Sequence, residues 1–301
     1  MWTGFGLAAM ALGLALEEDV STYDTWGVWD RDGQALIGYT YRFGDAELVR
    51  ISVETGTVEL ITDNEGNDWF PDVTRDGRYI VFVSDRDYGP FEGSDIYVLD
   101  RATGEERRVT HDGAMKLGLS VSPDGESIVF PATGEGGAND IWRVGFHGGE
   151  PENLTRSAEL DERNPSFGPD GQNVWMSVGE AGADRATGAA VLASLDLETG
   201  LVRERLNLGG QAASPRLNAA GDVLLTYRNT AGNRNIARFD PDTGEVVVLT
   251  RHEASDHAPF WSPDGHQISF STYRWGDSEI YLMAEDGSGM RNLTRTTADA
   301  D

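Results

Sequence analysis

The chain has 301 residues and no cysteine, so it is long enough to bury a full hydrophobic core and it has neither disulfides nor thiolate ligands. Its 51 Asp and Glu residues against 24 Lys and Arg give a net charge of -27, which disfavours binding to nucleic acid and to anionic membrane surfaces. A hydrophobic content of 39% is typical of a folded protein, and 37 glycines indicate many turns.

The first segment, residues 1–20, is an apolar leader. Residues 1–16 are apolar apart from Thr3, and the small residues around Ala15 resemble the core and cleavage site of an export signal, without its positively charged start. Sixteen residues are short for a membrane span. We therefore keep three interpretations: export or membrane association, an outer strand or cap of the domain that follows, and a misplaced start. The first favours an exported or cell-surface protein, and the others a cytoplasmic one.

A turn ending in glycine, most often Asp-Gly or Pro-Asp-Gly, recurs through the rest of the chain every 44 to 50 residues. In all six copies the residue four before this turn glycine and the residue three after it are apolar. The fifth copy lacks the Asp-Gly pair, and the fourth has a long Gly/Ala-rich stretch from Gly179 to Gly188. The six turn glycines are Gly33, Gly77, Gly125, Gly171, Gly221 and Gly265.

Each copy contains four stretches with strand character, which are clearest in the last copy. They are 258–262, 267–272, 279–284 and 291–294, with alternating polarity or β-branched and aromatic residues. Glycine-containing turns separate them. Four short antiparallel strands repeated at this period are typical of propeller blades. The sequence thus predicts an all-β fold, a six-bladed β-propeller with four antiparallel strands per blade, over residues 21–301.

The repeated motifs resemble those of the TolB-type, WD-repeat-like β-propeller family. They read D-x-x-P-x-W-S-P-D-G at 256–265, I-x-F-x-S/T at 268–272, D/E-I-Y at 279–281 and N-L-T at 292–294, with echoes in the second, third and fourth copies. The resemblance covers about residues 24 to 295 and implies the fold rather than a function, because turn formers and packing residues carry it. Similar propellers also precede the catalytic domain of prolyl-oligopeptidase-like peptidases and form the scaffold of oligogalacturonate lyases.

In a propeller, a ligand is expected at the mouth of the central channel, where the innermost strands begin. Those strand starts fall nine and eight residues before the turn glycine, here named positions −9 and −8. Their residue types vary where the rest repeats, and a mixture of aromatic, cationic and acidic side chains suits a peptide or a small polar ligand. The candidate binding residues at these positions are Asp68, Trp69, Lys116, Glu162, Arg163, Asp256 and His257.

The loops after the second strands add a further candidate. Arginine lies beside an aromatic residue in several of them, most clearly at Arg274 and Trp275. Exposed aromatic and arginine side chains are enriched in protein interfaces, although packing between loops would explain the same pattern.

No catalytic residue, metal site or cofactor is predicted. The chain has no G-x-S-x-G and no H-E-x-x-H motif, and its only lysine, Lys116, does not belong to a phosphate-binding loop. The five histidines lie in different loops and copies without the spacing of metal ligands.

These patterns predict a monomeric, non-enzymatic binding scaffold that holds a protein, peptide or small polar ligand at the channel mouth. One alternative is a carbohydrate lyase or hydrolase that uses His257 or Arg163 in the channel. Another is a gating propeller that works with a peptidase.

The basic residues are also unusual, because 23 of the 24 are arginine. Excess carboxylate with almost no lysine resembles the proteins of organisms that live in molar salt, where carboxylate repulsion is screened within about 3 Å. The other interpretation is an acidic protein from a GC-rich genome. If the halophile interpretation is right, cooperative unfolding will be lost as salt falls toward about 0.1 M, whereas a melting temperature indifferent to salt contradicts it.

Overall fold

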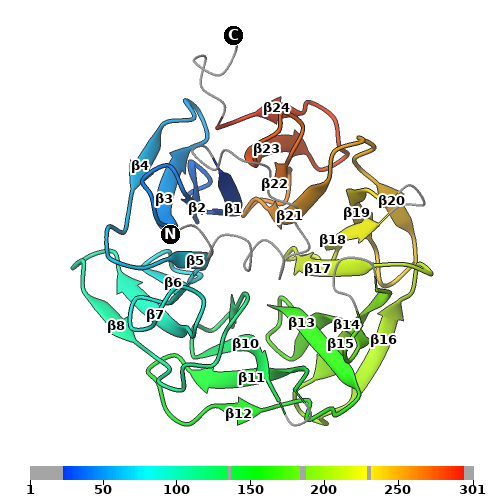
Figure 1. The fold of residues 1–301 in the computed structure, drawn as a ribbon. Coiled ribbons are helices and arrows are strands. Elements are labelled where there is room, and N and C mark those ends of the chain that lie inside the picture. The colour runs from blue at the N-terminus through cyan, green and yellow to red at the C-terminus, as the bar shows by residue number, and fades with distance from the viewer. Residues whose placement is uncertain (1–22, 135–136, 184–187, 229–231, 295–301) are drawn as a thin grey trace.

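The computed structural model describes residues 23–134, 137–183, 188–228 and 232–294. These residues form six four-stranded antiparallel sheets arranged as blades around a ring, and they contain no helix (Figure 1). The predicted six-bladed β-propeller is confirmed. The proposed leader, residues 1–20, lies outside the described residues.

Every blade uses four strands that are consecutive in the chain. Blade 1 contains β1 (Asp24–Trp29), β2 (Ala35–Thr40), β3 (Glu47–Ser52) and β4 (Val58–Leu60). Blade 2 contains β5 (Asp68–Val73), β6 (Tyr79–Ser84), β7 (Asp95–Asp100) and β8 (Glu106–Arg108). Blade 3 contains β9 (Ser120–Val121), β10 (Ser127–Thr133), β11 (Asn139–Gly145) and β12 (Glu152–Asn153).

The two copies that depart from the repeat still form complete blades. Blade 4 contains β13 (Leu160–Phe167), β14 (Asn173–Glu180), β15 (Ala190–Asp196) and β16 (Val202–Leu206). Blade 5 contains β17 (Ala212–Leu217), β18 (Val223–Arg228), β19 (Arg234–Phe239) and β20 (Val246–Val248). Blade 6 contains β21 (Asp256–Trp261), β22 (Gln267–Thr272), β23 (Glu279–Ala284) and β24 (Arg291–Asn292).

The recurring glycine turn joins the first and second strands of each blade. All six turn glycines have positive φ, between 69° and 96°, a region that side chains disfavour. Each glycine N–H donates to the carbonyl three residues earlier, at 2.8 to 3.1 Å, which closes a β-turn. The turn therefore fixes the order of strands within a blade, with the first strand toward the ring centre and the fourth at the rim (Figure 1).

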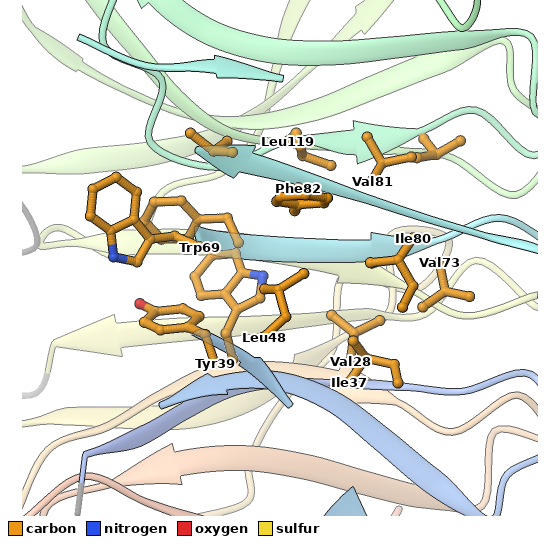
Figure 2. Close-up of a cluster of buried hydrophobic side chains, with 14 of the residues drawn as sticks. Val28, Ile37, Tyr39, Leu48, Trp69, Val73, Ile80, Val81, Phe82 and Leu119 are labelled. Atoms are coloured by element: carbon orange, nitrogen blue, oxygen red, sulfur yellow. The ribbon is translucent and has the colours of Figure 1, made fainter. Parts of the chain in front are cut away.

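Apolar side chains fill the space between blades. Eleven of the twelve repeated apolar positions are buried, and Leu217 is half-buried. Figure 2 shows this packing between blades 1 and 2, where Ile37 and Leu48 lie across from Ile80 and Phe82. A single sheet exposes both faces, so stacking of neighbouring blades is what buries the core.

Blades 1 and 6 close the ring without sharing a strand. The N–H of Asp24 donates to the carbonyl of Ser278 at 2.8 Å, and the Thr25 hydroxyl donates to that of Ser271 at 2.9 Å. Gly27 allows the close approach, because a Cβ there would lie 3.2 Å from the side chain of Ile280. Closure therefore depends on packing and hydrogen bonds between the first and last blades.

Candidate functional site

The two positions at which the inner strands begin point in different directions. The side chains at position −8 line a cavity in five of the six blades, whereas the side chains at position −9 are absent from its lining and are buried inside the blades. We call this space the strand-start cavity. Its position −8 residues are Thr25, Leu117, Arg163, Ala213 and His257.

Adjacent residues of a strand point to opposite sides, which explains this separation, and a β-bulge follows one residue further along. Position −7, seven residues before the turn glycine, has positive φ in all six copies, and only blade 3 has glycine there. In the other five blades the register shifts between positions −8 and −5. The bulge inserts one residue, so positions three apart can face the same side of the strand. The position −7 residues are Trp26, Phe70, Gly118, Asn164, Ser214 and Ala258.

In blades 1, 2 and 6, the acid at position −9 forms a buried ion pair within its own blade. Asp68 accepts from the guanidinium of Arg86 at 2.9 Å, and Asp256 accepts from Arg274 at the same distance. Asp24 pairs with Arg42 in the same way. Burial raises the pKa of the Asp68 carboxyl group, and the Arg86 charge opposes that rise.

Two other position −9 residues are buried without a loop arginine. The Lys116 ammonium is fully buried and donates to the Asp112 carboxylate at 2.5 Å and to the Ala114 carbonyl at 2.8 Å. Glu162 accepts from the hydroxyls of Thr155 and Ser157, both at 3.0 Å. Burial raises the pKa of Glu162 to about 7.

Trp69, at position −8 of blade 2, does not line the cavity. Its ring is 3% exposed and stacks on Phe91 at 5.2 Å, and its indole N–H donates to the Tyr41 hydroxyl at 3.0 Å. Trp69 therefore belongs to the packing between blades 1 and 2 (Figure 2).

The strand-start cavity has a volume of about 100 Å³ and a cationic lining. Of the residues that the structure describes, Arg163 and Arg234 line it and no Asp or Glu does. Arg163 also contacts the carboxylate of Asp161 at 3.2 Å. Burial lowers the pKa of Arg234, and the nearby charges of Arg228 and Arg163 lower it further.

His257 lies in the wall of this cavity. Its ring stacks on that of Tyr273 at 5.1 Å, and both ring nitrogens are buried without a hydrogen-bond partner among the described residues. Burial and the charge of Arg234 lower the pKa of His257 to about 3, so the imidazole is neutral at pH 7. A neutral imidazole carries one N–H donor that a ligand could use.

A second cavity, of about 420 Å³, opens at the other end of the channel, where the glycine turns lie. Position −5 of every blade lines this turn-side cavity. Among those residues, the Arg216 guanidinium lies over the rings of Trp26 and Phe260, which contact each other, at 5.2 and 4.9 Å from their centroids. Burial lowers the pKa of Arg216 to about 10. The position −5 residues are Val28, Asp72, Ser120, Ser166, Arg216 and Phe260.

The arginine–aromatic pair of the last blade is divided between packing and exposure. Arg274 lies over the rings of Phe270 and Tyr281 while it pairs with Asp256. Trp275 is 61% exposed, and its indole N–H donates to the Tyr281 hydroxyl at 2.8 Å. Of these two residues, Trp275 is the more exposed.

Sequence reasoning missed the bulge and two of the arginines. Arg234 begins the third strand of blade 5, and Arg216 lies near the end of β17, so neither occupies the expected strand starts. A spacing signal for the ion pairs was present, since Asp24 and Arg42, Asp68 and Arg86, and Asp256 and Arg274 are each 18 residues apart.

Two features are absent from the ranges that the structure describes. No three His, Asp or Glu side chains there come together as a metal-binding group. The same ranges contain no helix long and apolar enough to cross a membrane.

Comparison with known proteins gives matches in sequence and in structure. The TolB beta propeller domain family model matches residues 24–187. The Tol-Pal system protein TolB of Francisella tularensis subsp. tularensis is 26% identical over 241 residues, which are 78% of this chain and 53% of that protein. The chain thus spans about half the length of the curated relatives it matches.

Two solved structures illustrate the shared fold. TolB from Acinetobacter baumannii superposes with a TM-score of 0.71 and 22% identity, covering 92% of this chain and 64% of that one. An oligogalacturonate lyase in complex with manganese superposes with a TM-score of 0.60 and 16% identity, covering 87% and 89%. At these identities the superpositions establish the propeller fold.

Proposed function

This chain belongs to the TolB beta propeller domain family, and from that premise we propose that it is a protein-binding propeller whose partner docks at the strand-start end of the channel. The names of the curated relatives support a protein partner, because they are proteins of the Tol-Pal system.

The observation that carries the proposal is a set of exposed apolar side chains at the strand-start end. The register places the loops after the second strands at that end, since Asp24 pairs with Thr40 and Asp256 with Thr272. Four large apolar residues are exposed on these loops or at the approaches to inner strands, with exposed fractions from 38% to 61%. We call them the apolar rim, and they are Phe43, Leu160, Leu208 and Trp275.

The rim has the composition of a protein interface rather than of an ordinary acidic surface. Aromatic side chains are enriched in interface cores and charged ones are depleted. Among the large exposed hydrophobic residues of the described chain, Phe43 and Trp275 are the two aromatic ones. Phe43 lies in blade 1 and Trp275 in blade 6, and these two blades adjoin each other. The rim lies at the same end of the ring as the cationic cavity, so one partner can use both.

The test compares a rim variant with a matched control. The rim variant carries Phe43→Ala and Trp275→Ala. The control carries Leu201→Ala and Val202→Ala, which are similarly exposed at the outer strand of blade 4. Wild type, rim variant and control are used to capture proteins from the native lysate at high salt, after thermal unfolding has verified that all three are folded.

We expect a protein that wild type and control retain and that the rim variant loses. Equal capture by all three proteins would contradict docking at this end. Turnover of a sugar acid that His257→Ala abolishes would instead support the enzyme alternative.

A further inference from the structure

The charge of the channel is opposite to that of the protein. Acidic residues outnumber basic ones by 51 to 24 in the chain, yet the described residues that line the two cavities include five arginines and one carboxylate, Asp72. Low-dielectric walls concentrate the field of these arginines, so the channel interior attracts anions although the outer surface is acidic. The five arginines are Arg31, Arg75, Arg163, Arg216 and Arg234.

At the strand-start cavity, Arg234 is the lining arginine without a carboxylate partner in the described residues. Asp161 lies 3.2 Å from Arg163, and Arg228 donates to the Gly232 carbonyl at 2.6 Å. Arg234 forms no ion pair among the described residues, although it lies close enough to Arg163 and Arg228 for their charges to lower its pKa. Neighbouring guanidinium groups repel one another, so an anion placed between them would be bound favourably.

The uncharged groups of the lining also suit an anion. His257 has two buried ring nitrogens without partners in the described residues, one of which carries a proton. The same lining contains residues with amide side chains, such as Asn164 and Gln211, and residues with hydroxyl groups, such as Ser177. Buried polar groups are nearly always hydrogen-bonded, so the unpartnered imidazole indicates a missing partner.

The size of the cavity restricts the occupant. A volume of about 100 Å³ is small beside the roughly 300 to 1,000 Å³ of sites that enclose a whole drug-sized ligand. It suits a single carboxylate group at the end of a larger molecule.

We propose that the strand-start cavity is a carboxylate site, in which Arg234 and Arg163 bind an acidic side chain or terminal carboxylate of the peptide segment that the apolar rim captures. The identity of the occupant as a peptide rests on the proposed function. The carboxylate chemistry rests on the cavity alone.

The experiment measures binding of defined probes to the full chain. The probes are the tripeptides acetyl-Gly-Glu-Gly-amide and acetyl-Gly-Gln-Gly-amide, and free galacturonate. Binding is followed by the NMR signals of ¹³C-labelled histidine, since His257 reports from the cavity wall. The variants are Arg234→Gln, Arg234→Lys and the control Arg238→Gln, which lies on the same strand outside the cavity lining.

We expect the Glu peptide to shift the His257 signal and the Gln peptide to bind at least tenfold more weakly. Arg234→Gln should lose at least tenfold in affinity for the Glu peptide, Arg234→Lys should lose less, and Arg238→Gln should bind as wild type. Equal binding of the two peptides, or unchanged binding by Arg234→Gln, would overturn the site. Tighter binding of galacturonate than of the Glu peptide would overturn the peptide as occupant.

The two proposals fail separately. Loss of the capture difference between rim and control variants, with the Glu peptide still bound, contradicts the docking proposal. Intact capture without discrimination between Glu and Gln peptides contradicts the carboxylate site.

Discussion

Blades 1, 2 and 6 use their position −9 acids and loop arginines differently from blades 4 and 5. In the first group, each arginine after the second strand is bound by a buried carboxylate of its own blade, as in Asp68 with Arg86. In the second group, position −9 is Glu162 or Ala212, and arginines of those blades line the channel instead. The buried pairs therefore stabilise individual blades, and blades 4 and 5 supply three of the five arginines among the described residues that line the two cavities.

This difference explains why the same residue type has two roles in one fold. Arg86 stabilises a blade because its partner cannot reach water, whereas Arg234 faces a cavity without a carboxylate partner in the described chain. An arginine that faces a cavity can bind a ligand, but its charge repels the neighbouring arginines when no ligand is bound. The following predictions test this division, from the largest effect to the smallest.

Breaking a buried pair in the regular blades should have the largest effect. Arg86→Ala removes the partner of a fully buried carboxylate, and we expect the free energy of unfolding to fall by about 3 to 5 kcal/mol. Arg234→Ala removes a guanidinium that repels its neighbours and should cost less than about 1 kcal/mol. Denaturant unfolding at constant high salt measures both, and similar losses in the two variants would contradict the division.

Glu162 should make blade 4 sensitive to pH. Its pKa is raised to about 7 in the folded protein. As pH rises from about 4.5 to 7, the unfolded chain therefore loses this proton while the folded protein still holds it. The stability contributed by this group is therefore full below pH 4.5 and is lost as pH rises through 7. We expect Glu162→Gln to be more stable than wild type by roughly 3 kcal/mol at pH 8 and by much less at pH 4.5.

Unfolding free energies of wild type and Glu162→Gln across this pH range provide the measurement. A constant difference between the two proteins at every pH would show that Glu162 ionises normally. Glu126→Gln, an exposed carboxylate in a turn of blade 3, serves as the control.

Position −7, which has positive φ in every blade, should respond to substitution with opposite signs in different blades. Gly118 has φ of 114°, and a Cβ there would meet nothing within 4 Å, so Gly118→Ala introduces backbone strain alone and should cost about 1 to 2 kcal/mol. Ala258 already has a strained φ of 47°. We therefore expect Ala258→Gly to raise the free energy of unfolding by less than about 1 kcal/mol. Thermal unfolding measures both, and destabilisation by both substitutions would contradict a strained ring.

The sequence was sufficient for the architecture because turn and packing residues repeat. Strands β22 and β23 have the bounds expected from alternation, and β21 begins at Asp256, two residues before the expected start. The expected start coincides with the bulge at Ala258, and an alanine does not predict the positive φ found there. Strand alternation separates positions −9 and −8, but the sequence did not show which of the two faces the cavity.

The candidate site was predictable in part. Arg163 and His257 line the cavity as expected, while Asp68, Lys116, Glu162 and Asp256 are buried in blades. Arg234 reaches the cavity from the third strand of its blade, a long-range placement that strand spacing does not encode. Whether any of these residues binds a partner remains a prediction.

The central claim, a partner docked at the strand-start end, is tested most directly by site-specific crosslinking in the producing cells. A photo-crosslinking phenylalanine analogue replaces Trp275 in one protein and Leu201 in another, because both positions are exposed and lie on different parts of the ring. We predict a crosslinked protein from position 275 that position 201 does not yield. The same adduct from both positions, or an adduct from position 201 alone, would contradict the account.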